Sequence, residues 1–218
     1  LTTMFAIDVT SYAVMMNHYH ILVRVNVEKA AMWSADEIFE HWSVLFQVPD
    51  LIRQFLAGHL IELKDIQAAE NMIEIYRERL TSISWFMRCL NEHIARLANF
   101  EDKCTGRFWE GRFKSQAILD EAALINTMVY IDLNPIRAKI AETPESSKYA
   151  SIAERIAERN LTSEFQCATH GKLLPFMDGK GLTDAPHIPM HLIDYIELVD
   201  WTGRQFRPDK RGIICEAA

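Results

Sequence analysis

Residues 17–25, NHYHILVRV, decide how the fold begins, together with the apolar run at 5–14 that precedes them. The apolar runs 5–14 and 18–25 are rich in Val, Ile, Leu and Tyr and are separated by residues 15–17, so the pattern predicts two strands joined by a tight turn. Residues two apart on a strand point to the same face. We therefore expect His18 and His20 to present both imidazoles to one side, where they could share a metal ion.

Helical periodicity follows this hairpin. Ser34 and Glu37 have the spacing of a capping box at the start of a helix, and residues 51–63, 66–80 and 82–98 also show helical spacing, with an interruption expected near Gly58. The sequence thus predicts a largely helical stretch after the hairpin.

A second strand-then-helix pattern comes later in the chain. Residues 107–119, RFWEGRFKSQAIL, predict an extended basic and aromatic strand. Asp120 is the expected N-cap of a helix over 121–133, which Pro135 should terminate. Shorter helices are expected at 151–158 and 188–199. The order of strands, helices, strand and helices indicates an α+β fold.

Composition limits the possible functions. The 218 residues carry 23 Lys and Arg against 30 Asp and Glu, a formal charge of −7. This charge argues against a protein that holds nucleic acid by bulk electrostatics, so any nucleic-acid site should be a local basic patch. The sequence has no apolar run of about 18 residues and no recognisable signal peptide, and its four cysteines are scattered. We expect a cytoplasmic protein with reduced thiols and no membrane partner.

Two residues of the helix before Pro135 carry chemistry. Tyr130 and Asn134 are four apart, so their side chains share one helix face. Taken alone, Tyr130 could equally be a core aromatic, and Asn134 could equally be a C-cap.

Three stretches together resemble a known family. NHYHILVRV (17–25), TGRFWEGRFKSQAILDEAAL (105–124) and MVYIDLNPIRAKIA (128–141) look like the HUH single-strand DNA transposases, and most of all the REP-associated tyrosine transposases of insertion-sequence-200-like type. The resemblance covers about residues 5–145, and the motifs occur in the family's order. It implies a ferredoxin-like domain in which an antiparallel sheet carries the histidines.

The resemblance also implies residue roles. His18 and His20 match the family's metal-binding histidine–hydrophobic–histidine motif, Tyr130 matches its nucleophile, and Asn134 matches the amide that completes the metal shell. A tyrosine phenol is mostly protonated at neutral pH and needs help to attack. A divalent ion, Mg or Mn, would polarise the scissile phosphate, and attack by Tyr130 would give a 5′-phosphotyrosine link and a free 3′-hydroxyl.

Several side chains are candidates for contact with single-stranded or hairpin DNA. Basic and aromatic residues alternate in one stretch, as expected for such a surface, and two more cations follow the tyrosine helix. The candidates are Arg107, Trp109, Arg112, Lys114, Arg137 and Lys139. A second basic cluster near the C-terminus comprises Arg204, Arg207, Lys210 and Arg211. For each set, a solvated basic surface is the alternative.

The expected organisation is a catalytic domain at 1–145, with a helical insertion at 28–80, and a helical C-terminal extension at 146–218. The family domain normally begins with a strand and a helix before the hairpin; because His18 lies so near residue 1, we expect these to be absent, with the true start upstream or Leu1 at an unusual initiation codon. The protein is expected to be a monomer or homodimer.

Two other functions are compatible with the residues. One is a truncated or domesticated relative that binds DNA hairpins without cutting. The other is a zinc-dependent hydrolase that uses His18 and His20 or a C-terminal group with the spacing of zinc ligands. That group comprises Cys167, His170, His187 and His191.

Overall fold

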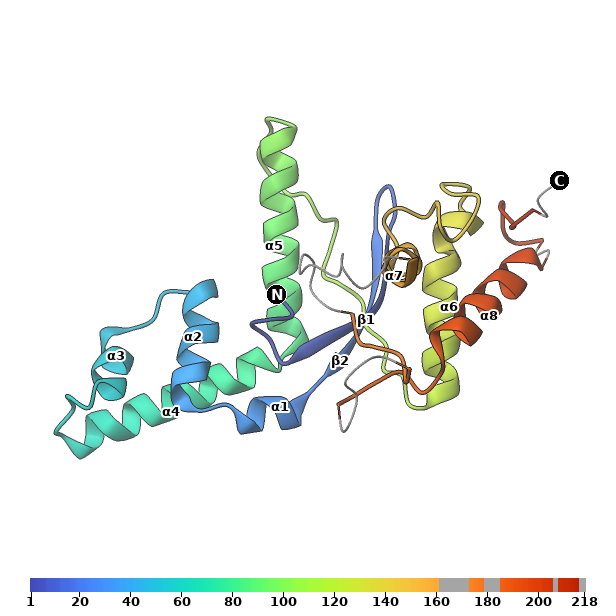
Figure 1. Cartoon of the computed structure of the whole chain (residues 1–218). Helices are drawn as coiled ribbons and strands as arrows, with labels where there is room; N and C mark the ends of the chain where they lie inside the picture. Colours follow the sequence, from blue (N-terminus) through green and yellow to red (C-terminus); the bar gives the residue numbers. More distant parts are fainter. Residues whose placement is uncertain (161–172, 179–184, 206–207, 216–218) are drawn as a thin grey trace. The chain divides into compact units, whose positions relative to one another are not determined.

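The computed structural model describes residues 1–160, 173–178, 185–205 and 208–215, and the chain divides into two compact units (Figure 1). Unit 1 consists of Leu1–Asp8 and Val25–Gln116, and unit 2 consists of Val9–Arg24 and Ala117–Ala218. The chain passes from one unit to the other inside both strands of its hairpin. Its elements are mixed α and β.

The hairpin is formed by β1 (Ile7–Val14) and β2 (Tyr19–Val25), which pair as an antiparallel two-stranded sheet. The backbone N–H of Met15 donates to the carbonyl of His18 at 2.9 Å and closes the turn. The predicted hairpin is thus confirmed. Among the described residues, the sheet is extended by one isolated antiparallel bridge, between Ala13 and Ala150.

Unit 1 is otherwise helical. Its helices are α1 (Val27–Met32), α2 (Ala35–Leu45), α3 (Asp50–Leu56), α4 (Leu63–Leu80) and α5 (Ile83–Glu101).

Local signals set these helix ends. Ser34 and Glu37 form the predicted capping box at the start of α2. Gly58 follows the end of α3 with a φ of +71°, a conformation that glycine adopts without a steric penalty. The rings of Trp42 and Tyr76 stack with centroids 4.5 Å apart and join α2 to α4.

Unit 2 packs the hairpin with α6 (Glu121–Arg137), α7 (Ser151–Asn160) and α8 (Leu192–Arg204). Asp120 caps α6 as predicted, because its carboxylate accepts from the N–H of Ala123 at 2.7 Å. Most of the C-terminal half of α6 is buried. Tyr195, Val199 and Ile214 pack in the same core as α6. Residues beyond 145 thus share a core with α6, and the boundary expected at 145 differs from the observed division.

Pro135 does not end α6, contrary to the prediction. The helix runs to Arg137, and the burial of Pro135 and Ile136 offsets the missing proline N–H. The helix ends where Lys139 takes a φ of +60°. There the N–H of Lys139 donates to Ile136 and that of Ile140 to Pro135, a Schellman arrangement.

Residues 107–119 do not form the predicted strand. They contain no regular secondary structure and follow α5 closely enough for the Trp109 Nε1–H to donate to the carbonyl of Asn91 at 2.9 Å. A segment in which basic and aromatic residues alternate favours an extended backbone. A strand, however, also needs a neighbouring strand with a free edge to pair with. Here the contact is with a helix.

Candidate functional site

His18 and His20 lie on one side of the hairpin, as predicted. Their ring centroids are 5.1 Å apart and the rings are almost perpendicular, at 87°. His18 stands just before β2 and His20 within it. The Nδ1–H of His18 donates to the side-chain oxygen of Asn17 at 2.8 Å, which leaves the lone pair on Nε2 for another ligand.

Tyr130 of α6 comes close to this histidine pair. Its ring centroid is 5.8 Å from that of His20, with the planes at 74°. The side chain is 49% exposed, so Tyr130 is not the core aromatic that its helix position also allowed. The packing of α6 beside the hairpin thus brings together two motifs that are far apart in the sequence.

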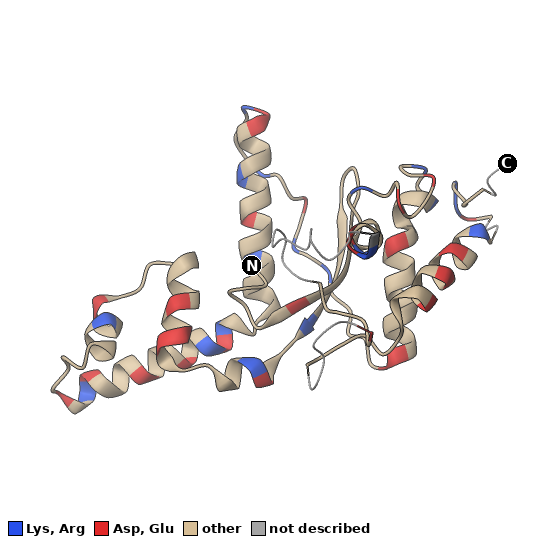
Figure 2. Ribbon diagram, viewed as in Figure 1, with Lys and Arg blue, Asp and Glu red and all other residues tan. Residues whose placement is uncertain are grey.

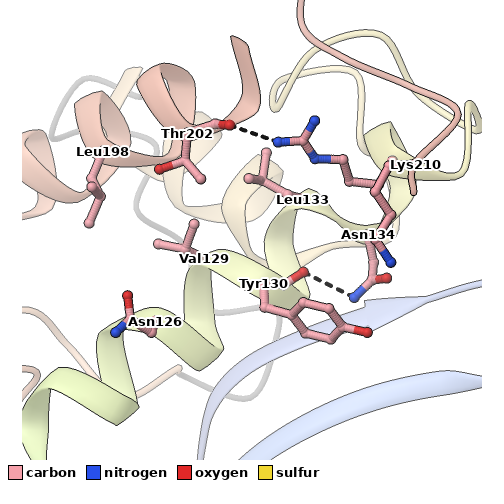
Figure 3. A pocket seen from close by; sticks show the side chains of 9 residues that line it. Asn126, Val129, Tyr130, Leu133, Asn134, Leu198, Thr202 and Lys210 are labelled. Carbon is pink, nitrogen blue, oxygen red and sulfur yellow. Dashed lines mark hydrogen bonds between the residues drawn. The ribbon is translucent and has the colours of Figure 1, made fainter. Parts of the chain in front are cut away.

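Asn134 lies one helical turn beyond Tyr130. Its Nδ2 donates to the backbone carbonyl of Tyr130 at 3.0 Å (Figure 3). Asn134 is not the C-cap of α6, which is Ala138. The hydrogen bond holds the amide group by its nitrogen, so the carboxamide oxygen is the atom that could bind a cation.

Electrostatics favour neutral imidazole at His20. Burial lowers the pKa of His20 below its ordinary value, and the nearby His18 lowers it further. Neutral imidazole is the form that binds metal ions and the form that can accept a proton.

The residues present fit a divalent ion that also takes oxygen ligands from substrate or water. Two imidazoles and one carboxamide oxygen suit Mn, Zn or Co, and Mg when other oxygens complete the shell. A denser ligand group, with three or more His, Cys, Asp or Glu side chains, does not occur in the part of the chain that the structure describes. His18, His20 and Asn134 stay the candidate ligands that the sequence resemblance implies.

Arg137 does not present its guanidinium for phosphate contact as expected. It is 8% exposed, and its terminal nitrogens donate to the carbonyls of Thr202, Gln205 and Gly212 at 2.7–3.2 Å. These bonds fix the C-terminal segment against the end of α6. The sequence did not indicate that Arg137 is used inside the protein, because its three acceptors lie far along the chain.

The remaining candidates for DNA contact are more accessible. Lys139 is exposed at the end of α6, in unit 2. Arg107, Arg112 and Lys114 are exposed in unit 1, and Trp109 is half-buried there. Because the segment is not a strand, its side chains need not point alternately to two opposite faces.

A buried polar cluster in unit 2 was not predicted. Asp132, fully buried, accepts from the Ser151 hydroxyl at 2.6 Å, the Ile152 N–H at 3.1 Å and the Tyr195 hydroxyl. Burial raises the pKa of Asp132 above its ordinary range, and burial together with the Asp132 charge raises that of Tyr195. The cluster ties α6 to α7 and α8 on the side of α6 away from solvent.

The alternative zinc group cannot be assembled from the described residues. Cys167 and His170 lie outside them, as does Arg207 of the second basic cluster. His187 has its Nδ1 3.1 Å from the carbonyl of Ala185, and His191 is the N-cap of α8.

Cys89, Cys104 and Cys215 are free thiols. Within the described ranges, none of the helices has the length and apolarity needed to cross a membrane.

Comparison with known proteins gives no relative from which a role could be transferred. No family model, no curated protein and no solved structure matches this chain.

Proposed function

We propose that this protein nicks and rejoins single-stranded or hairpin DNA through a 5′-phosphotyrosine intermediate on Tyr130, with a divalent ion as cofactor. The observation that carries the proposal is the convergence of His18, His20 and Tyr130 from the hairpin and α6, with ring centroids 5.1 and 5.8 Å apart. Each motif alone has an ordinary structural explanation. Their meeting at a half-exposed tyrosine favours catalysis.

The fold is consistent with this proposal at the level of its parts. An antiparallel hairpin carries the histidines and a helix carries the tyrosine, as in the ferredoxin-like HUH domain that the sequence resembles. We propose that the described hairpin and α6 are the core of such a domain, and that α1–α4 form an insertion.

The chemistry balances without an external energy source. The Tyr130 phenol loses its proton and its oxygen bonds to phosphorus, while the bond from phosphorus to the 3′-oxygen breaks and that oxygen takes up a proton. A bound divalent ion would polarise the phosphate and offset its developing charge. Reversal by another 3′-hydroxyl releases Tyr130 and rejoins the DNA. His18, His20 and Asn134 would hold the ion.

The test is a denaturing-gel assay for a covalent protein–DNA adduct. The full chain is mixed with a labelled hairpin oligonucleotide taken from the DNA that flanks its own gene, with Mg or Mn. We expect a metal-dependent adduct with the parent and none with Tyr130→Phe, because the phenol oxygen forms the bond. His18→Ala should also lose the metal-stimulated adduct.

Native-gel binding is the control for both variants. Tyr130→Phe should bind the hairpin within about twofold of the parent, since it removes a single exposed oxygen. An adduct that persists in Tyr130→Phe would contradict the assigned nucleophile. Specific binding without any adduct would instead indicate a DNA-hairpin-binding protein that does not cut. Tight stoichiometric zinc with activity indifferent to Tyr130→Phe would indicate a hydrolase.

A further inference from the structure

One face of α6 forms a groove with the C-terminal part of unit 2. The α6 residues that line it are spaced so that they share one side of the helix. They are Asn126, Val129, Tyr130, Leu133, Asn134 and Arg137. Leu198 and Thr202 of α8, with Lys210, complete a cavity of about 160 Å³ (Figure 3).

The groove combines apolar walls with a few polar groups. Val129, Leu133 and Leu198 supply the apolar surface, while Asn126 and Thr202 supply an amide and a hydroxyl. This mixture is typical of sites for small planar ligands, in which apolar walls hold the ring and polar groups read its edge. A cavity of this size is of the order of a single nucleobase.

Lys210 places positive charge at this groove. The segment that carries it is fixed on α6, because the N–H of Gly212 donates to the carbonyl of Arg137 and the Arg137 guanidinium donates back to the carbonyl of Gly212. The ammonium group lies 3.8 Å from the Asp209 carboxylate, at the long limit of an ion pair. Such a partly exposed pair leaves Lys210 able to contact a phosphate as well.

The acidic residues of α8 affect how the base and the phosphate of a nucleotide would be oriented in the groove. Asp194 and Glu197 are exposed acidic residues of α8, whereas Asp200 on the same helix is paired with Arg204 (Figure 2). Phosphates are repelled from such a surface, so a DNA backbone is favoured on the Lys210 side and a base on the α8 side.

We propose that this groove binds the base of a nucleotide next to the phosphate that Tyr130 attacks, with Lys210 contacting the DNA backbone. The position relative to cleavage rests on the proposed function, because Tyr130 and Asn134 both line the groove. The binding of a base rests on the groove itself. Such a groove would let this acidic protein bind single-stranded DNA through local contacts, although its net charge is negative.

The experiment measures binding by fluorescence anisotropy in EDTA, with two labelled probes. One is a single-stranded 20-mer of randomised sequence, and the other is an abasic 20-mer that keeps the phosphates but has no bases. The parent chain should bind the first at least about fivefold more tightly, since base contacts add to backbone contacts. Thr202→Trp fills the groove and should remove this preference. Lys210→Ala should weaken both probes by a similar factor.

Matched controls sit outside the groove. Ile193→Trp adds an indole to an exposed position of α8, and Lys148→Ala removes one exposed cation from unit 2. Both should bind within about twofold of the parent. Circular dichroism melting checks that each variant folds, and Lys210→Ala keeps the test decisive should Thr202→Trp not fold.

The outcomes separate this inference from the proposed function. Groove variants that bind both probes like the parent overturn the groove, and so does a parent that shows no preference for bases. The adduct assay on the same proteins judges Tyr130 independently. If binding depends on the groove but no adduct forms, the groove is supported and cleavage is contradicted. If an adduct forms and Thr202→Trp keeps the preference of the parent for bases, cleavage is supported and the groove is contradicted.

Discussion

At the scale of single residues, the candidate site depends on how two histidines and one tyrosine are held. His18 is oriented by Asn17 through its Nδ1–H, and His20 is partly buried beside Tyr130. The sequence predicted that the two imidazoles share a side, because a strand has a period of two. It could not predict the partial burial of His20, which depends on the helix packed beside the hairpin.

The lowered pKa of His20 gives a prediction for metal binding. Protonated imidazole cannot bind a metal ion, so affinity for Mn should fall with decreasing pH once the pH passes the His20 pKa, which lies below the ordinary value of 6.5. Calorimetric titration of the parent with Mn between pH 7.5 and 5 should therefore show affinity held near neutral pH and lost on the acid side, by about tenfold per pH unit for each imidazole that must lose a proton to bind.

His20→Gln is the variant for comparison. Its side-chain oxygen could still bind a cation but does not titrate, so part of the acid-side loss should disappear while affinity at neutral pH falls. Equal pH dependence in parent and variant would show that His20 is not a ligand.

At the scale of elements, α6 organises unit 2. One side carries Tyr130 and Asn134, and another buries Asp132 against α7 and α8. Sequence signals gave the start of α6 through Asp120 but misplaced its end, because burial of Pro135 and a left-handed Lys139 are properties of the packed structure. The predicted strand at 107–119 failed for a similar reason, since composition does not supply a partner strand.

The end of α6 gives a stability prediction. A Cβ added at Gly212 would clash with the carbonyl oxygen of Ile136, so Gly212→Ala must push the C-terminal segment away from α6. We expect the free energy of unfolding to fall by about 1–3 kcal/mol, as in other overpacked sites. Urea denaturation followed by circular dichroism measures it.

Gly111→Ala is the matched control, because nothing lies within 4 Å of its added Cβ. Loss of unfolded-state freedom should leave that variant neutral or slightly more stable than the parent. If Gly212→Ala also unfolds like the parent, the segment that carries Lys210 does not pack on α6 as described.

At the scale of the whole molecule, the formal charge of −7 requires that any DNA contact be local. The exposed cations Arg107, Arg112 and Lys114 form such a local group in unit 1. Lys210 forms another at the groove of unit 2.

Salt dependence tests the unit 1 group. Each phosphate contact on single-stranded DNA contributes about 0.7 to the slope of log affinity against log salt concentration. Replacing Arg107, Arg112 and Lys114 together by Ala should therefore make the slope shallower by about 2 and weaken binding at low salt. Anisotropy titrations from 50 to about 300 mM salt measure the slope.

The control replaces three other exposed cations of unit 1, Arg53, Lys64 and Arg96, and changes the net charge by the same amount. Its slope should stay within experimental error of the parent. Equal effects of the two triple variants would mean that net charge, and not the 107–114 segment, governs binding.

The sequence by itself determined the elements whose signals are local. The hairpin, the caps at Ser34 and Asp120, the break at Gly58 and the shared side of His18 and His20 all follow from residue type and spacing. Only the tertiary structure decided that Tyr130 meets His20, that Arg137 is used inside the protein, and that Leu198, Thr202 and Lys210 close a groove beside Tyr130. The physical reason is that these contacts join residues distant in the chain, and packing and burial, which no local pattern encodes, select them.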